Sequence, residues 1–172
     1  KFRKFSKFFS LKNIQKNGSW NATFEQTLSN TFKKQCNFPK STRLVIPLSA
    51  GYDSRVILTQ AMTTGYRNIF AYTYGIKGSF EHKIAQSVCD RLGIQNHFVE
   101  STTKNIKTFF KTQIRQDFER LSDDISSGPI FHDLYVTNRL LEMGQITEND
   151  VLINGNTGDF ITGGHIPSQL SP

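Results

Sequence analysis

Residues Leu44–Arg55 read LVIPLSAGYDSR, and this stretch decides the fold. Its first five residues form a short apolar run between turn-forming residues, which is typical of a buried β-strand. The small residues of Ser-Ala-Gly then make a tight turn. Asp53 and Ser54 follow as N-terminal signals of a helix that the apolar pattern carries to Thr63. The stretch therefore predicts a strand that leads directly into a helix.

The same alternation continues along the chain. Further strands are predicted at 68–74, 97–99 and 151–153, and helices at 21–35, 79–92, 103–120 and 131–143. Strands that alternate with helices in this way predict an α/β fold with a parallel sheet covered on both faces, in three layers. Ligands bind such sheets beyond the carboxyl ends of the strands. The first and fourth strands both end in glycine-containing turns with an aspartate, so we expect the site there.

The turn after the first strand has the chemistry of a phosphate site. It presents backbone N–H groups and the positive end of a helix, and Ser49 and Ser54 could add hydroxyl donors. Asp53 suits a phosphate site only if a cation lies between its carboxylate and the phosphate. Mg²⁺ can fill that place. The lysine of a Walker loop is missing, so this is a different phosphate cradle. The alternative is a plain connection in which Asp53 only caps the helix.

Composition limits the partners. The net charge of +7 is confined to the N-terminal part, because residues 1–43 hold ten Lys/Arg against one acid and the rest hold eleven against thirteen. We interpret residues 1–20 as a basic, aromatic arm and residues 21–172 as one domain, and expect no nucleic-acid partner. No apolar run approaches the roughly 20 residues of a membrane span. Two distant cysteines without metal-ligand spacing suit a reducing compartment, so we expect a cytoplasmic protein.

Two motifs carry a resemblance to a known family. SAGYDS resembles the SGGxDS signature of the PP-loop ATP pyrophosphatases, which have the adenine nucleotide alpha hydrolase-like fold. Residues 151–164 read VLINGNTGDFITGG and resemble the VLxSGEGADELFGG pattern of the asparagine synthetase C-terminal domain. The resemblance implies a pyrophosphate site, an adenosine site and a catalytic Mg²⁺ site. Their residues would be Ser49, Ala50, Gly51, Asp53 and Ser54 for pyrophosphate, Ala71, Tyr72, Thr73, Asn154 and Gly155 for adenosine, and Asp53 and Asp159 for Mg²⁺.

The same resemblance implies an activity. The family uses ATP to activate a carboxylate as an acyl-adenylate with release of pyrophosphate, and ammonia then displaces AMP. The chain is thus expected to be an asparagine synthase-like carbon–nitrogen ligase, with ammonia made from glutamine in a domain before Lys1. It is also expected to be incomplete after Pro172. Because a sheet face would then lack cover, it is expected either to associate as a homo-oligomer or to belong to a larger parent protein. The alternative is a nucleotide-binding module of the same fold without catalysis.

The sequence departs from that family at four positions. Ala50 replaces a glycine of the loop, Asn156 replaces the glutamate of GEGAD, and Thr157 and Phe160 replace the next Gly and the Glu of ADE. Because Asn156 is neutral, these departures favour ATP binding over asparagine formation. We further predict a negative φ at Ala50, since a positive φ would disfavour alanine.

Overall fold

The computed structural model describes residues 20–122 and 130–155. The chain divides into two compact units, Lys1–Asn37 and Phe38–Pro172. In the first unit the described part is helix α1 (Trp20–Gln35), which agrees with the predicted helix. Lys33 and Lys34 lie in its last turn, where positive charge is favourable to the helix dipole. The predicted boundary at residue 20 stays a prediction.

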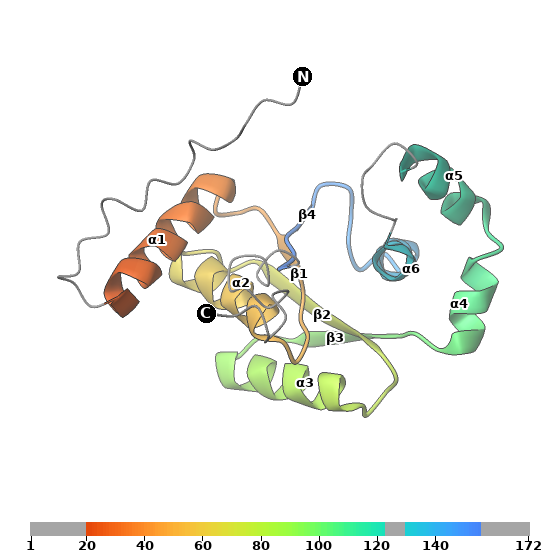
Figure 1. Cartoon of the computed structure of the whole chain (residues 1–172), viewed down its shortest axis with the longest axis horizontal. Helices are drawn as coiled ribbons and strands as arrows, with labels where there is room; N and C mark the ends of the chain where they lie inside the picture. The colour runs from red at the N-terminus through yellow and green to blue at the C-terminus, as the bar shows by residue number, and fades with distance from the viewer. Residues whose placement is uncertain (1–19, 123–129, 156–172) are drawn as a thin grey trace, which may run out of the picture. The chain divides into compact units, whose positions relative to one another are not determined.

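The second unit is built on a four-stranded parallel sheet, as the sequence predicts (Figure 1). The strands are β1 (Leu44–Pro47), β2 (Ile69–Gly75), β3 (Asn96–Glu100) and β4 (Val151–Leu152), in the order β3-β2-β1-β4. Leu44 pairs with Ile69 on one side and with Val151 on the other. The central position of β1 buries Leu44–Ile46 on both faces, which explains the unbroken apolar run.

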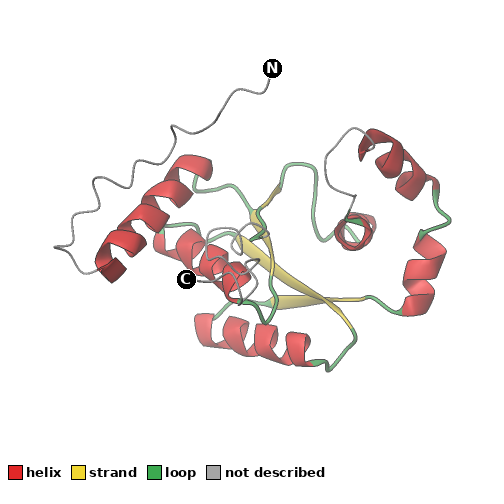
Figure 2. Ribbon diagram, in the orientation of Figure 1, coloured by secondary structure: helices red, strands yellow, loops and turns green. Residues whose placement is uncertain are grey.

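The connections place helices on both faces (Figure 2). The connections from β1 to β2 and from β2 to β3 run the same way across the sheet, so by the right-handed rule for such crossovers α2 (Tyr52–Thr63) and α3 (Phe80–Leu92) lie on one face. The chain then reverses direction to reach β4, so α6 (Phe131–Glu142) covers the opposite face. There a core cluster joins Val45, Phe70, Tyr72 and Val99 of the sheet to Tyr135, Val136 and Leu140 of α6. The reversal at β1 and β4 makes their carboxyl ends the switch point where ligands bind such sheets.

One predicted element is wrong. The helix expected over 103–120 is two helices, α4 (Thr103–Phe109) and α5 (Gln113–Ser122). Both the N–H and the hydroxyl of Thr112 donate to the carbonyl of Phe109, at 2.9 and 2.7 Å, which closes a turn in place of a further helical turn. The break lets Phe109 enter the core while Phe110 packs on Phe131, with ring centroids 5.2 Å apart. No helix in the described ranges is long and apolar enough to cross a membrane.

Candidate functional site

The loop between β1 and α2 is held together by its own serines. The hydroxyl of Ser54 accepts the N–H of Ser49 at 3.1 Å and donates to the carbonyl of Gly51 at 3.2 Å. The hydroxyl of Ser49 accepts the N–H of Gly51 at 3.0 Å. Both hydroxyls were expected to be phosphate donors. The structure engages them within the loop, so their first effect is to fix its shape.

Arg55 braces the same loop from the helix side. Its guanidinium donates to the carbonyl of Ala50 at 2.7 Å and to that of Gly51 at 3.1 Å, and it stacks on the ring of Tyr52. Because N–H and C=O point in opposite directions across a trans peptide, holding the Gly51 carbonyl turns the N–H of Tyr52 away from Arg55. Sequence reasoning missed this residue, although it directly follows the motif.

The N-terminus of α2 is available to an anion. Its N-cap is Gly51, at φ −72° and ψ 153°, and no side-chain cap is found there among the described residues. Asp53 is the second helical residue, so it is not the cap that the alternative interpretation required. The first N–H groups of a helix have no intrahelical acceptor and attract negative charge. The predicted negative φ of Ala50 is confirmed, since no non-glycine residue of the described part has a positive φ.

A cavity of about 640 Å³ lies at the carboxyl ends of β1, β2 and β4. Eight of the predicted site residues line it: Ser49, Gly51, Asp53, Ser54, Tyr72, Thr73, Asn154 and Gly155. Ala50 and Ala71 are not among the lining residues, and Ala71 is fully buried within the sheet. Asp159 lies outside the described residues. The structure thus brings together the two turns that sequence reasoning selected.

Gly155 packs closely against Asp53 of the other turn. A Cβ atom at this position would lie 3.0 Å from the backbone carbon of Asp53 and 3.1 Å from its Cβ, so only glycine fits without a shift. Asp53 is half-buried and, in the described part of the chain, its carboxylate has no hydrogen bond or ion pair. An oxygen donor of this kind fits Mg²⁺, which proteins bind through one or two carboxylates together with substrate phosphates.

Two further acids line the cavity that the sequence analysis did not select. Glu81, in the first turn of α3, accepts the N–H of Ala50 through Oε2 at 2.6 Å. Asp133, in the first turn of α6, accepts the hydroxyl of Tyr74 at 3.2 Å. Helix N-termini lie at the carboxyl edge of a parallel sheet whenever the helix follows a strand or leads back to one. First-turn acids were therefore the signal that could have found both residues.

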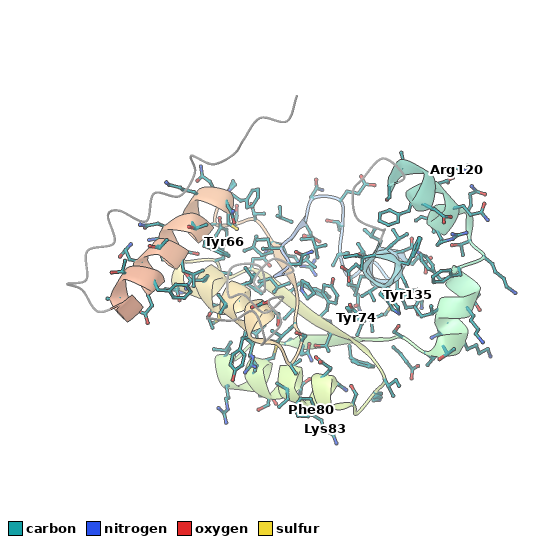
Figure 3. All side chains as sticks on the ribbon, in the orientation of Figure 1. Tyr66, Tyr74, Phe80, Lys83, Arg120 and Tyr135 are labelled. Atoms are coloured by element: carbon teal, nitrogen blue, oxygen red, sulfur yellow. The ribbon has the colours of Figure 1, made fainter. Side chains whose placement is uncertain are left out.

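The electrostatics of the cavity are acidic. Asp53, Glu81 and Asp133 line it, and its described lining contains no Lys, Arg or His. Tyr74, labelled in Figure 3 beside α6, has its pKa raised to about 12, first by burial and then by the charge of Asp133. Burial and Asp133 also raise the pKa of Tyr72. Both phenols are therefore neutral near pH 7, and a polyphosphate can enter this cavity favourably only with cations.

Comparison with known proteins gives a family and a fold. The family model described as queuosine biosynthesis protein QueC matches residues 43–147, more than half of the chain. The NH3-dependent NAD synthetase from Campylobacter jejuni superposes with a TM-score of 0.52 at 17% identity, over 83% of this chain and 59% of that one. The NMN synthetase from Francisella tularensis gives 0.49 at 20% identity, over 83% and 58%. No curated protein matches the chain.

These findings confirm the predicted fold and the predicted PP-loop superfamily. The chain spans about 59% of the length of the NAD synthetase, and at this identity the likeness concerns the fold alone. The match over residues 43–147 runs from the residue before β1 to the segment after α6, and so includes the whole SAGYDS loop. The family that matches differs from the asparagine synthetases that the sequence motifs resemble: the chain belongs to the family of the queuosine biosynthesis protein QueC.

Proposed function

We propose that this chain binds Mg²⁺-ATP in the cavity at the strand ends and acts as an ATP-dependent ligase domain that releases pyrophosphate. The observation that carries the proposal is the meeting of the two turns. The braced loop after β1 leads into a helix N-terminus with no side-chain cap, and Gly155 brings the end of β4 against Asp53. Phosphate-binding N–H groups and an oxygen ligand for Mg²⁺ thus open into one cavity.

Different residues of the cavity bind different parts of ATP. The loop at Ser49–Gly51 and the first turn of α2 bind the pyrophosphate part of ATP. Tyr72, Thr73, Asn154 and Gly155 would contact adenosine, and all four line the same cavity. Asp53, together with Asp159, holds Mg²⁺, which when bound neutralises the charge of the leaving pyrophosphate. The N–H groups of the first turn of α2 stabilise the same charge.

The acceptor is a carboxylate that is activated as an acyl-adenylate with release of pyrophosphate. Ammonia then attacks the acyl carbon, the bond to the AMP oxygen breaks, and a carbon–nitrogen bond forms as AMP leaves. Support comes from the likeness of residues 151–164 to the asparagine synthetase pattern, and from a structural neighbour whose name states that it depends on NH3. Ammonia would be free or come from a glutaminase domain. The name of the matching family makes acids of queuosine biosynthesis the first acceptors to test.

The test identifies which phosphate bond of ATP is cleaved, from the products that form. The chain is incubated with Mg²⁺, ammonium and ATP labelled in the α-phosphate, with and without a panel of carboxylic acids. We expect acid-dependent AMP and an equal amount of pyrophosphate, and only background from Asp53→Asn. Formation of ADP and phosphate would contradict the proposal. Binding of ATP without AMP under every condition would favour the alternative, a nucleotide-binding module without catalysis.

A further inference from the structure

We propose that Glu81 is an internal anion that competes with nucleotide phosphate for the N–H of Ala50 and so makes binding depend on a divalent cation. This inference rests on the proposed function, because it concerns the same phosphate site. Glu81 lies in the first turn of α3, and its side chain reaches the loop that precedes a different helix, α2.

The contact uses the one N–H of the loop that remains exchangeable. The N–H of Ser49 is bonded to Ser54, and the N–H of Gly51 is bonded to Ser49, so both are tied up within the loop. The N–H of Ala50 instead donates to a charged group from outside, the Glu81 carboxylate at 2.6 Å. One N–H serves one strong acceptor. A phosphate oxygen that takes this donor must therefore displace the carboxylate.

Among the described residues, no steric barrier prevents a phosphate oxygen from displacing the Glu81 carboxylate, but the negative charges of the cavity oppose it. Glu81 is exposed, and in the described part of the chain the bond to Ala50 is its only hydrogen bond. The side chain can therefore rotate away into solvent without leaving another partner unpaired. However, the carboxylate lines the same cavity as Asp53 and Asp133, so free polyphosphate meets three like charges. A divalent cation between phosphate and carboxylate removes that repulsion, which is why Glu81 should select the cation complex.

A structural role for Glu81 would have the opposite sign. If the carboxylate only held the loop in its binding shape, its removal would weaken phosphate binding with or without a cation. If it competes, its neutralisation strengthens binding, and does so most when no cation is present. Glu81→Gln separates the charge from the contact, because its amide oxygen can still accept the N–H of Ala50. Glu81→Ala removes both.

The experiment is calorimetric titration with inorganic pyrophosphate, in EDTA and in Mg²⁺, of the full chain and its variants. We expect Glu81→Gln to bind pyrophosphate about tenfold more tightly in EDTA, since juxtaposed like charges are costly, and within about threefold of the parent chain in Mg²⁺. Glu81→Ala should change in the same direction. Glu148→Gln, an exposed glutamate before β4, is the matched control for net charge and should leave both affinities unchanged.

The outcomes separate this inference from the proposed function. If the parent chain binds pyrophosphate in Mg²⁺ but both Glu81 variants bind equally or more weakly in EDTA, the competition is refuted and the proposed site stands. An equal gain from Glu148→Gln would also refute it, because the effect would then be general charge. If no variant and no parent chain binds pyrophosphate under either condition, both the site and the inference are wrong.

Discussion

At the scale of single residues, Arg55 holds the loop after β1 from the helix side. It donates to two successive loop carbonyls, those of Ala50 and Gly51. We expect Arg55→Ala to lower the affinity for Mg²⁺-ATP about tenfold, in line with the loss of one or two hydrogen bonds from a charged donor. Arg55→Lys should recover only part of it, because an ammonium group lacks the planar fork.

Arg67 supplies a matched control for this prediction. Its guanidinium also donates to two backbone carbonyls, those of Met62 and Tyr66, at the opposite end of α2 from the loop. Arg67→Ala should therefore reduce stability to a similar extent and leave the affinity for Mg²⁺-ATP unchanged. Titration calorimetry and thermal unfolding of both variants make the comparison. Equal losses of affinity would mean that Arg55 acts through the stability of α2 and not through the loop.

For single residues, the sequence predicted which ones line the cavity better than it predicted the hydrogen bonds that they make. Asp53, Asn154 and Gly155, which the turn motifs selected, all line the cavity, because turn motifs at strand ends are local features of the sequence. Their roles in binding stay predictions. Ser49 and Ser54 were assigned to phosphate, yet their hydroxyls bond within the loop. The hydrogen-bond partners of a hydroxyl depend on the exact path of the backbone, which a sequence motif does not specify.

At the scale of elements, β2 contributes two tyrosines, Tyr72 and Tyr74, to the wall of the cavity. Burial and then Asp133 raise the pKa of Tyr74 from its ordinary value of 10.0 to about 12. Between these values the unfolded chain has lost the phenolic proton and the folded chain has kept it. The free energy of unfolding should therefore fall as the pH rises from about 10 to about 12.

Replacement of Asp133 tests whether burial or the charge of Asp133 raises the pKa of Tyr74 more. Asp133→Asn should lower the pKa of Tyr74 but leave it above 10.0, because burial is the larger cause and the substitution does not change it. Tyr74→Phe should make the alkaline loss of stability less steep, and the phenolate absorbance that it removes identifies the Tyr74 titration. A Tyr74 titration at its ordinary value in Asp133→Asn would show that the charge, and not burial, dominates.

The elements themselves were largely predictable. All four strands and the helices α1, α2, α3 and α6 were expected within about two residues, because their apolar runs and helical periodicity are local features of the sequence. The break between α4 and α5 was not expected, since residues 110–112 contain neither Gly nor Pro. It arises from Thr112 bonding back to Phe109 and from the burial of Phe109 in the core, and the second of these is a long-range effect.

At the scale of the whole molecule, every described residue that lines the cavity belongs to the unit Phe38–Pro172. Ligand binding should therefore stabilise that unit. A ligand at 100 times its dissociation constant adds about 2.7 kcal/mol to the free energy of unfolding. For a chain of this size each kcal/mol raises Tm by about 2–4 °C, so we expect Mg²⁺-ATP to raise Tm by about 5–10 °C.

Asp53→Asn makes this shift diagnostic for the proposed site. Since the Asp53 carboxylate makes no hydrogen bond or ion pair with the described residues, its neutralisation should leave Tm without nucleotide nearly unchanged. The shift with Mg²⁺-ATP should nevertheless be largely lost, because the cation that offsets the acidic cavity loses its protein ligand. Scanning calorimetry with Mg²⁺ alone, ATP alone and both together resolves the contributions. A full shift in Asp53→Asn would show that the Asp53 carboxylate does not hold the cation, and would contradict the proposed metal site.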